Sequence, residues 1–149
     1  MTETIILNEQ NFISFVDQET EKIVTELLSD GYDAKDIFHY WHSFKDCKFV
    51  KTYFEDFANQ LQAMSCMFDK DDARDILTAY LYLNGLEYAR ECIKDYVGEY
   101  ESVGDFAYEY TTERYDVPTF VIDCIDWDDL YAYQLKDYYV FFCGYIFVR

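Results

Sequence analysis

Histidine, glycine and proline are scarce in this 149-residue sequence. The shortages of histidine and glycine each argue against a class of enzyme. The two histidines, His39 and His42, offer few general bases, and no Gly-x-Ser-x-Gly motif supplies a hydrolase nucleophile. The five glycines form no phosphate-binding loop. Neighbouring carboxylates such as Asp71 and Asp72 suit acid–base chemistry, but with 30 acids such pairs arise by chance. We therefore expect no catalytic residues and no enzyme activity.

The cysteines do not follow a pattern typical of disulfide bonds or of a structural metal site. Its five copies, an odd number, form no Cys-x-x-Cys pair, so reduced thiols are the simplest expectation. His39, His42 and Cys47 are spaced loosely like metal ligands, but a structural zinc site takes four ligands at recognised spacings, so we expect no metal and no cofactor. The opening residues MTETIILNEQ carry acids where a secretory signal is positive, and no apolar run is as long as a membrane span. The expected location is the cytoplasm.

Basic residues are also few, and the resulting charge is the strongest signal in the sequence. Thirty acids stand against 12 lysines and arginines, which leaves a net charge of −18. Residues 1–50 hold 10 acids and 4 bases, residues 51–97 hold 9 and 5, and residues 98–149 hold 11 and 3. A negative surface disfavours direct binding to nucleic acid or to anionic membranes, because both are polyanions. We expect a basic partner.

Hydrophobic spacing and helix caps predict a predominantly helical α+β chain that ends in a small β-hairpin. We divide it into a helical segment 1–50, a helical domain 51–97 and an acidic α+β domain 98–149. The hairpin is expected in YYVFFCGYIFVR, residues 138–149, with Cys143 and Gly144 as its turn, although one continuous strand is the alternative. The expected helices cover about residues 9–29, 33–44, 50–67, 70–84, 86–97, 102–115 and 126–137. Their expected N-caps are Asn8, Asp33, Asp69, Ser102 and Asp126.

The stretch YVGEYESVGDFAYEYTTERYDVP, residues 96–118, places like charges where they repel. Its acids Glu101, Asp105, Glu109 and Glu113 recur every fourth residue. Such pairs cost about 0.2–0.5 kcal/mol each in a helix, so the row is tolerable. It is either a solvated helix face or part of a rigid imitation of nucleic-acid phosphates. The other acids expected on outward faces are Asp17, Glu21, Asp33, Asp36, Glu55, Asp56, Asp71, Asp75, Glu87, Glu91, Asp126, Asp128 and Asp129.

Several segments resemble the ArdA-type antirestriction proteins. Residues 89–110, ARECIKDYVGEYESVGDFAYEY, are similar to the core signature of that family, a helix that ends in a Tyr-x-Gly-Glu-Tyr turn before Ser-x-x-Asp-Phe-Ala. VPTFVIDCIDWDDLYAYQL, residues 117–135, resembles the family's proline, Ile-Asp stretch and acidic-aromatic helix, and residues 137–149 resemble its closing strands. Residues 54–89 are similar less specifically. The resemblance covers about residues 54–149, and the Gly-Glu-Tyr turn with Ser-x-x-Asp-Phe-Ala is its specific part.

The resemblance implies a DNA-mimicking inhibitor from a phage or mobile element. Such proteins are elongated, acidic and usually dimeric, and they occupy the DNA-binding groove of type I restriction–modification enzymes of the host. It implies a homodimer that forms through about residues 125–149. The partner-binding acids that we expect, by resemblance or by their place in the acidic stretch, are Glu99, Glu101, Asp105, Glu109, Glu113, Asp116, Asp126, Asp128 and Asp129.

The first 50 residues depart from the family, whose members begin with a small α/β domain that has glycine-rich turns. Here the same region is expected to be helical. A different target therefore stays open: an acidic inhibitor or adaptor of another host protein that acts on DNA or RNA.

Overall fold

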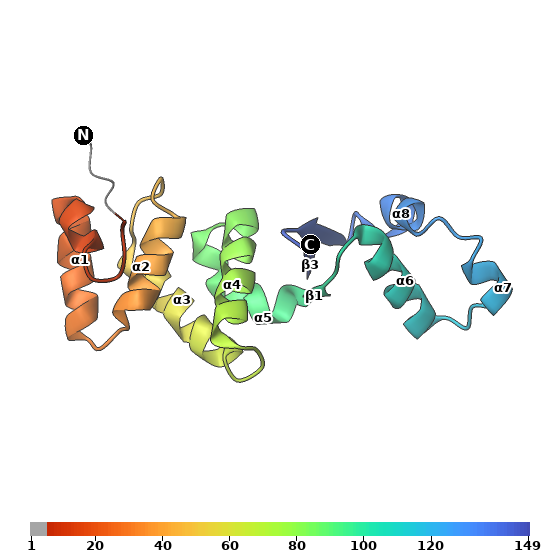
Figure 1. Ribbon diagram of the computed structural model, residues 1–149, viewed down its shortest axis with the longest axis horizontal. Coiled ribbons are helices and arrows are strands. Elements are labelled where there is room, and N and C mark those ends of the chain that lie inside the picture. The colour runs from red at the N-terminus through yellow and green to blue at the C-terminus, as the bar shows by residue number, and fades with distance from the viewer. Residues whose placement is uncertain (1–5) are drawn as a thin grey trace.

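A computed structural model describes residues 6–149 and confirms a predominantly helical α+β fold with a small C-terminal sheet. The molecule is elongated, and the chain runs from a group of helices at one end, past the sheet, to a second group at the other end (Figure 1). The α-helices are α1 (Gln18–Ser29), α2 (Ala34–Ser43), α3 (Lys51–Met64), α4 (Lys70–Asn84), α5 (Cys92–Asp95), α6 (Val103–Arg114), α7 (Thr119–Ile122) and α8 (Trp127–Leu130). The 3-10 helices are η1 (Phe12–Phe15) and η2 (Leu86–Glu91), η3 (Tyr131–Leu135) is a π-helix, and the strands are β1 (Tyr96–Glu99), β2 (Tyr139–Phe142) and β3 (Tyr145–Val148).

Local signals set the starts of the helices. The carboxylate of Asp17 accepts the backbone N–H of Thr20 at 2.7 Å, and that of Asp33 accepts the N–H of Lys35 at 2.7 Å. Ser102 accepts the N–H of Asp105 at 3.1 Å, as its expected role as N-cap requires. Each bond satisfies a donor that the first helical turn leaves free.

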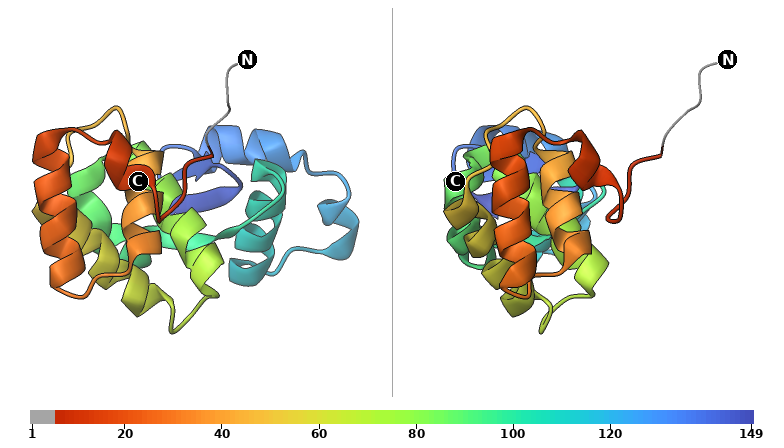
Figure 2. Two further views of the ribbon diagram at one scale, coloured as in Figure 1. Left: turned by 60° about the vertical axis from the view of Figure 1, so that its left-hand side comes forward. Right: turned by 90° about the vertical axis from the view of Figure 1, so that its left-hand side faces the viewer.

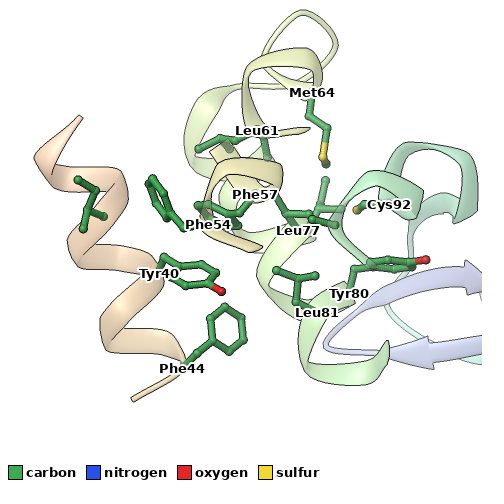
Figure 3. Close-up of a cluster of buried hydrophobic side chains, with 14 of the residues drawn as sticks. Tyr40, Phe44, Phe54, Phe57, Leu61, Met64, Leu77, Tyr80, Leu81 and Cys92 are labelled. Carbon is green, nitrogen blue, oxygen red and sulfur yellow. The ribbon is translucent and has the colours of Figure 1, made fainter. Parts of the chain in front are cut away.

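The larger core is built from aromatic rings of α2, α3 and α4. The ring of Tyr40 lies 5.1–5.4 Å, centroid to centroid, from the rings of Phe44, Phe49, Phe54 and Phe57 (Figure 3). The buried residues of this cluster run from Phe12 to Cys92 and are joined by Phe147 of the last strand. One core therefore crosses residue 50, so the described residues before it and the helical domain after it form one packed body. Figure 2 shows α1 and α2 covering its end.

A smaller core lies beyond the sheet. Its buried residues are Phe106, Ala107, Tyr131, Leu135 and Ile146. Phe106 contacts Tyr100, Tyr110, Tyr131 and Tyr139, with ring centroids 5.1–6.3 Å apart. This core fixes α6 against the segment that contains η3.

The C-terminal hairpin is confirmed, and it gains a third strand. β2 and β3 pair antiparallel through the turn Cys143-Gly144, where both residues have positive φ, 54° and 85°, as a two-residue hairpin turn demands. β1 pairs with β3 on its other side, so β3 is the central strand. The prediction that residues 86–97 form one helix is wrong, because helix ends at Asp95 and Tyr96 begins the edge strand.

Two other expected helices differ in detail. The helix expected at 9–29 is interrupted, because η1 ends at Phe15, Val16 is extended and α1 starts only after the Asp17 cap. Asn8 accordingly caps no long helix; its side chain accepts the N–H groups of Gln10 and Asn11 instead. The helix expected at 126–137 passes from α8 into the π-helical turns of η3, and α7 was not expected. No helix within residues 6–149 is long and apolar enough to cross a bilayer.

Asp36 corrects another expectation. The sequence places it on the outer face of α2 as a capping-box residue, but its carboxylate is buried and binds Arg74 of α4, with Nη2 and Nε both 3.1 Å from Oδ1. Lys70 lies 3.4 Å from its other oxygen. Arg74 also holds Asp71 at 2.7 Å. This buried carboxylate ties α2 to α4 and takes no part in the surface charge.

Arg74→Ala should lower the free energy of unfolding by about 3 kcal/mol, because it leaves the Asp36 carboxylate buried without its closest partner. Arg90→Ala is the matched control. Its guanidinium is exposed and binds Asp56 at 2.9 Å, so its loss should cost less than about 1 kcal/mol. Urea denaturation followed by circular dichroism measures both. Equal losses would contradict the structural role of the buried pair.

Candidate partner-binding surface

The nine acids expected to bind a partner all lie in the part of the chain that we call the acidic unit, residues 98–149. Eight of them are exposed, and Glu109 is half-buried. In Figure 1 the helices α6, α7 and α8 of this unit form the end of the molecule opposite to α1. The carboxylates are thus on the outside of one end of an elongated protein.

Helix α6 carries the row at four-residue spacing. Asp105, Glu109 and Glu113 occupy one face, because residues four apart lie above one another on a helix. Phe106 and Ala107 are buried in the smaller core, with Val103 and Tyr110 packed against them. This packing fixes the orientation of α6 and with it the direction of the acidic row.

Glu109 is tied more closely to the protein than its neighbours. It is half-buried and faces Tyr100, the residue that follows β1. Burial first, and then the neighbouring carboxylates of Glu109 and Glu113, raise the pKa of the Tyr100 hydroxyl. The middle carboxylate of the row thus lies beside the ring that packs on Phe106.

Helix α8 brings a second group of acids beside α6. Gly104 makes the approach possible, because a side chain at this position would collide with the carboxylate of Asp128. That carboxylate lies against the first turn of α6, where the helix dipole favours negative charge. Tyr108 and Trp127 join the two helices edge to face, with centroids 5.3 Å apart. The structure thus brings together the acids of α6 and α8, which the sequence could place only on separate helices.

The remaining predicted acids are set at the borders of the unit. Asp126 is turned toward its own helix, since it accepts the N–H of Asp129 at 3.1 Å as the expected N-cap. Glu99 ends β1, Glu101 leads into α6, and Asp116 follows it; all three are exposed. They extend the negative surface along the chain on both sides of α6.

Ion pairs divide the molecule into two parts. Every ion pair found in the described chain joins residues between Glu19 and Lys94, in the helical body formed by α1–α5. None of the nine predicted acids forms one with another residue of the 6–149 stretch. The acids of the helical body are therefore partly neutralised, whereas those of the acidic unit are not.

The cations of the acidic unit are used for other contacts. The guanidinium of Arg114 lies 3.8 Å above the ring of Tyr110 and donates to the Tyr110 carbonyl oxygen. Arg149 donates from Nε to the carbonyl oxygens of Lys136 and Tyr139 at 2.6 and 3.2 Å. Two of the three basic residues in this unit thus bind backbone oxygen or an aromatic ring. Neither contact pairs an arginine with a carboxylate of the acidic unit.

The histidine–cysteine group does not gather into a metal site. His39 Nε2 lies 2.9 Å from the Thr78 hydroxyl oxygen, and its ring stacks on Phe57. Burial lowers the pKa of His39. His42 stacks on Phe38 instead, and Cys47 lies exposed in the loop after α2. Within residues 6–149, no three or more histidine, cysteine, aspartate or glutamate side chains form a group that could hold a metal ion.

Exposed aromatic side chains accompany the acids, and no pattern in the sequence distinguishes them from buried ones. Tyr115, Phe120, Tyr133 and Tyr138 are 63%, 78%, 81% and 67% exposed. Tyrosine and phenylalanine are frequent throughout the sequence, so composition does not tell core rings from surface rings. Interfaces are enriched in aromatic residues and depleted in lysine, which suits a surface that meets a protein.

Searches of protein-family models, curated proteins and solved structures find no match for this chain. The likeness to ArdA-type proteins therefore rests on the motifs quoted above. The structural features that bear on function are the charge, exposure and packing of the acidic unit.

Phe106→Ala should loosen the acidic unit while the helical body stays folded. The ring is 2% exposed, so its removal should cost about 4 kcal/mol of the smaller core. Hydrogen exchange by mass spectrometry should show faster exchange in α6 and unchanged protection in α3 and α4. Glu113→Ala, on the exposed face of α6, is the control and should leave both patterns unchanged. Uniform loss of protection along the chain would mean that the two cores unfold as one.

Proposed function

We propose that this protein is a DNA-mimicking antirestriction protein that occupies the DNA-binding groove of a type I restriction–modification enzyme in the host cytoplasm. The observation that carries the proposal is the set of nine carboxylates on the acidic unit, which are exposed or half-exposed and have no cationic partner within residues 6–149. A protein groove that binds duplex DNA supplies the lysines and arginines that such a surface lacks.

Rigid presentation supports mimicry. Residues four apart on α6 are separated by about 6 Å along its axis, and phosphates along one DNA strand by about 3.4 Å. One straight helix cannot follow both phosphate rows, so acids must come from several elements. Here they come from α6, α8 and the segments around them, fastened by Gly104 and by the Tyr108–Trp127 contact. A fixed array loses less entropy on docking than a flexible acidic tail.

A homodimer is part of the proposal. The segment 125–149, through which the resemblance implies dimerisation, exposes Tyr133, Tyr138 and Val148. Exposed apolar side chains in one segment suit a surface that binds protein. Two copies joined at this segment would lengthen the negative surface beyond one acidic unit.

A second target class is favoured by the first 50 residues. They form η1, α1 and α2 on the common core, where the resemblance would imply an α/β domain. The same acidic unit would fit the basic groove of another host enzyme that acts on DNA or RNA. Affinity capture from host lysate followed by mass spectrometry separates the two: recovery of the subunits of a restriction–modification enzyme supports the first, and recovery of a polymerase or nuclease alone supports the second.

The protein should compete with duplex DNA for a type I methyltransferase complex. Adding it to a labelled duplex bound to the enzyme should release the duplex in a fluorescence anisotropy titration. Raising the salt concentration from 50 to 200 mM should weaken its affinity by about tenfold or more, because charge attraction is screened. Binding that leaves DNA occupancy unchanged would refute mimicry for that enzyme.

Reversing the α6 row should weaken inhibition without unfolding the protein. The variant Asp105→Lys, Glu109→Lys, Glu113→Lys should bind the enzyme about 100-fold less tightly, since close charge pairs at interfaces contribute several kcal/mol. Its far-ultraviolet circular dichroism should match that of the original chain.

The matched control reverses Glu21, Asp46 and Glu87, three exposed acids of the helical body that form no ion pair among the described residues. Both triple variants change the net charge from −18 to −12, since each replacement adds two charges. The control should keep at least about a third of the original affinity. Equal losses in both variants would show that total charge, and not the acidic unit, determines binding.

A further inference from the structure

A cavity at the other end of the molecule has features of a small-molecule site. It lies in the helical body, far along the chain from the acidic unit, between the start of α1, the second half of α2 and the loop that follows α2. Its volume is about 360 Å³, which falls within the range of ligand pockets. Phe15, Trp41, Phe44 and Phe49 line it with aromatic surface.

The strongest sign of a ligand is a buried hydroxyl group. Tyr40 lines this cavity and is 1% exposed, yet its hydroxyl has no hydrogen-bond partner in the described chain. Figure 3 shows the ring among the core side chains, with its hydroxyl pointing away from α2. An unpaired buried hydroxyl costs about 1–3 kcal/mol, whereas phenylalanine would pack equally well without that cost. A tyrosine at this position gains from a partner that the chain itself does not supply.

The loop that follows α2 borders the cavity on its solvent side. Lys45, Asp46, Cys47 and Lys48 are all exposed, and the N–H of Cys47 donates to the carbonyl oxygen of Phe44 at 3.0 Å. The same loop borders a second hollow of about 470 Å³, which also contains Phe44 and Cys47. A ligand can therefore approach the cavity from the side of this loop.

The charged groups at the cavity define the polarity of its ligand. Glu19 is paired with Lys48 at 3.8 Å, and Asp17 accepts the N–H of Thr20 at 2.7 Å. Lys45 forms no ion pair among residues 6–149, and its ammonium lies 6.0 Å from the centre of the Trp41 ring. The cavity thus offers the Lys45 ammonium beside aromatic surface, while the Asp17 carboxylate is held at the start of α1 by the N–H of Thr20.

We propose that this cavity binds a small aromatic molecule that carries one anionic group. The aromatic body would pack against Trp41 and Phe44, the anionic group would pair with Lys45, and a polar atom would pair with the hydroxyl of Tyr40. This site is separate from the acidic unit and from the DNA-mimic proposal, so either can hold without the other.

The test uses 8-anilinonaphthalene-1-sulfonate, which has the proposed aromatic body, a single anionic sulfonate and an N–H group. Its fluorescence should report one bound probe per chain of the native protein. Bound probe should slow the reaction of Cys47 with iodoacetamide, measured per cysteine by mass spectrometry. Cys66, Cys124 and Cys143 are also exposed, and they should react at unchanged rates. Equal protection of all four, or none at Cys47, would overturn the proposal.

Two variants test the named contacts. Tyr40→Phe should weaken probe binding about fivefold, the loss of one hydrogen bond, while the free protein melts at the same temperature or higher. Lys45→Glu should also weaken binding, and Lys35→Glu in α2, exposed and outside the cavity, is its matched control. Binding unchanged in both Tyr40→Phe and Lys45→Glu would refute the site. If Tyr40→Phe fails to fold, the comparison of Lys45→Glu with Lys35→Glu decides alone.

Discussion

The pairing of β3 at the centre of the sheet is the interaction on which the rest of the molecule depends. Adjacent residues of a strand point to opposite faces, and here the two faces belong to different cores. Phe147 packs into the aromatic core of the helical body, and Ile146 packs into the smaller core under α6; both are fully buried. One short strand thus joins the helical body, which contains the ion pairs, to the acidic unit, whose nine predicted acids form none among the described residues.

This arrangement places the ion pairs and the unpaired acids in different parts of the molecule. A chain with a net charge of −18 repels itself, and in the helical body ion pairs and stacked rings offset that repulsion. In the acidic unit the basic residues Arg114 and Arg149 bind a ring and backbone oxygens instead of carboxylates. The nine predicted acids there form no ion pair among the described residues, while the smaller core packs α6 against η3.

Features with a local cause could be predicted from the sequence. Ser102 starts α6 by capping it, Pro118 limits its extent, and Cys143-Gly144 allows the hairpin turn. Features that depend on distant residues could not be predicted. Tyr96 begins a strand only because β3 comes beside it, and Asp36 is buried only because Arg74, 38 residues away, reaches its carboxylate. The sequence predicts which acids are exposed at this end of the chain, but their grouping on adjoining helices depends on the close approach of α8 to Gly104.

The central position of β3 has a consequence for how the protein is made. β1 and the acids of α6 leave the ribosome well before β3, so during synthesis the acidic row has neither the Ile146 side chain beneath it nor the strand that aligns Tyr100. The helical body can collapse early around its rings, apart from the contribution of Phe147. In a nascent chain the acids of α6 would therefore lie on a flexible segment. Under the proposed function, the protein could bind its target only after β3 has entered the sheet.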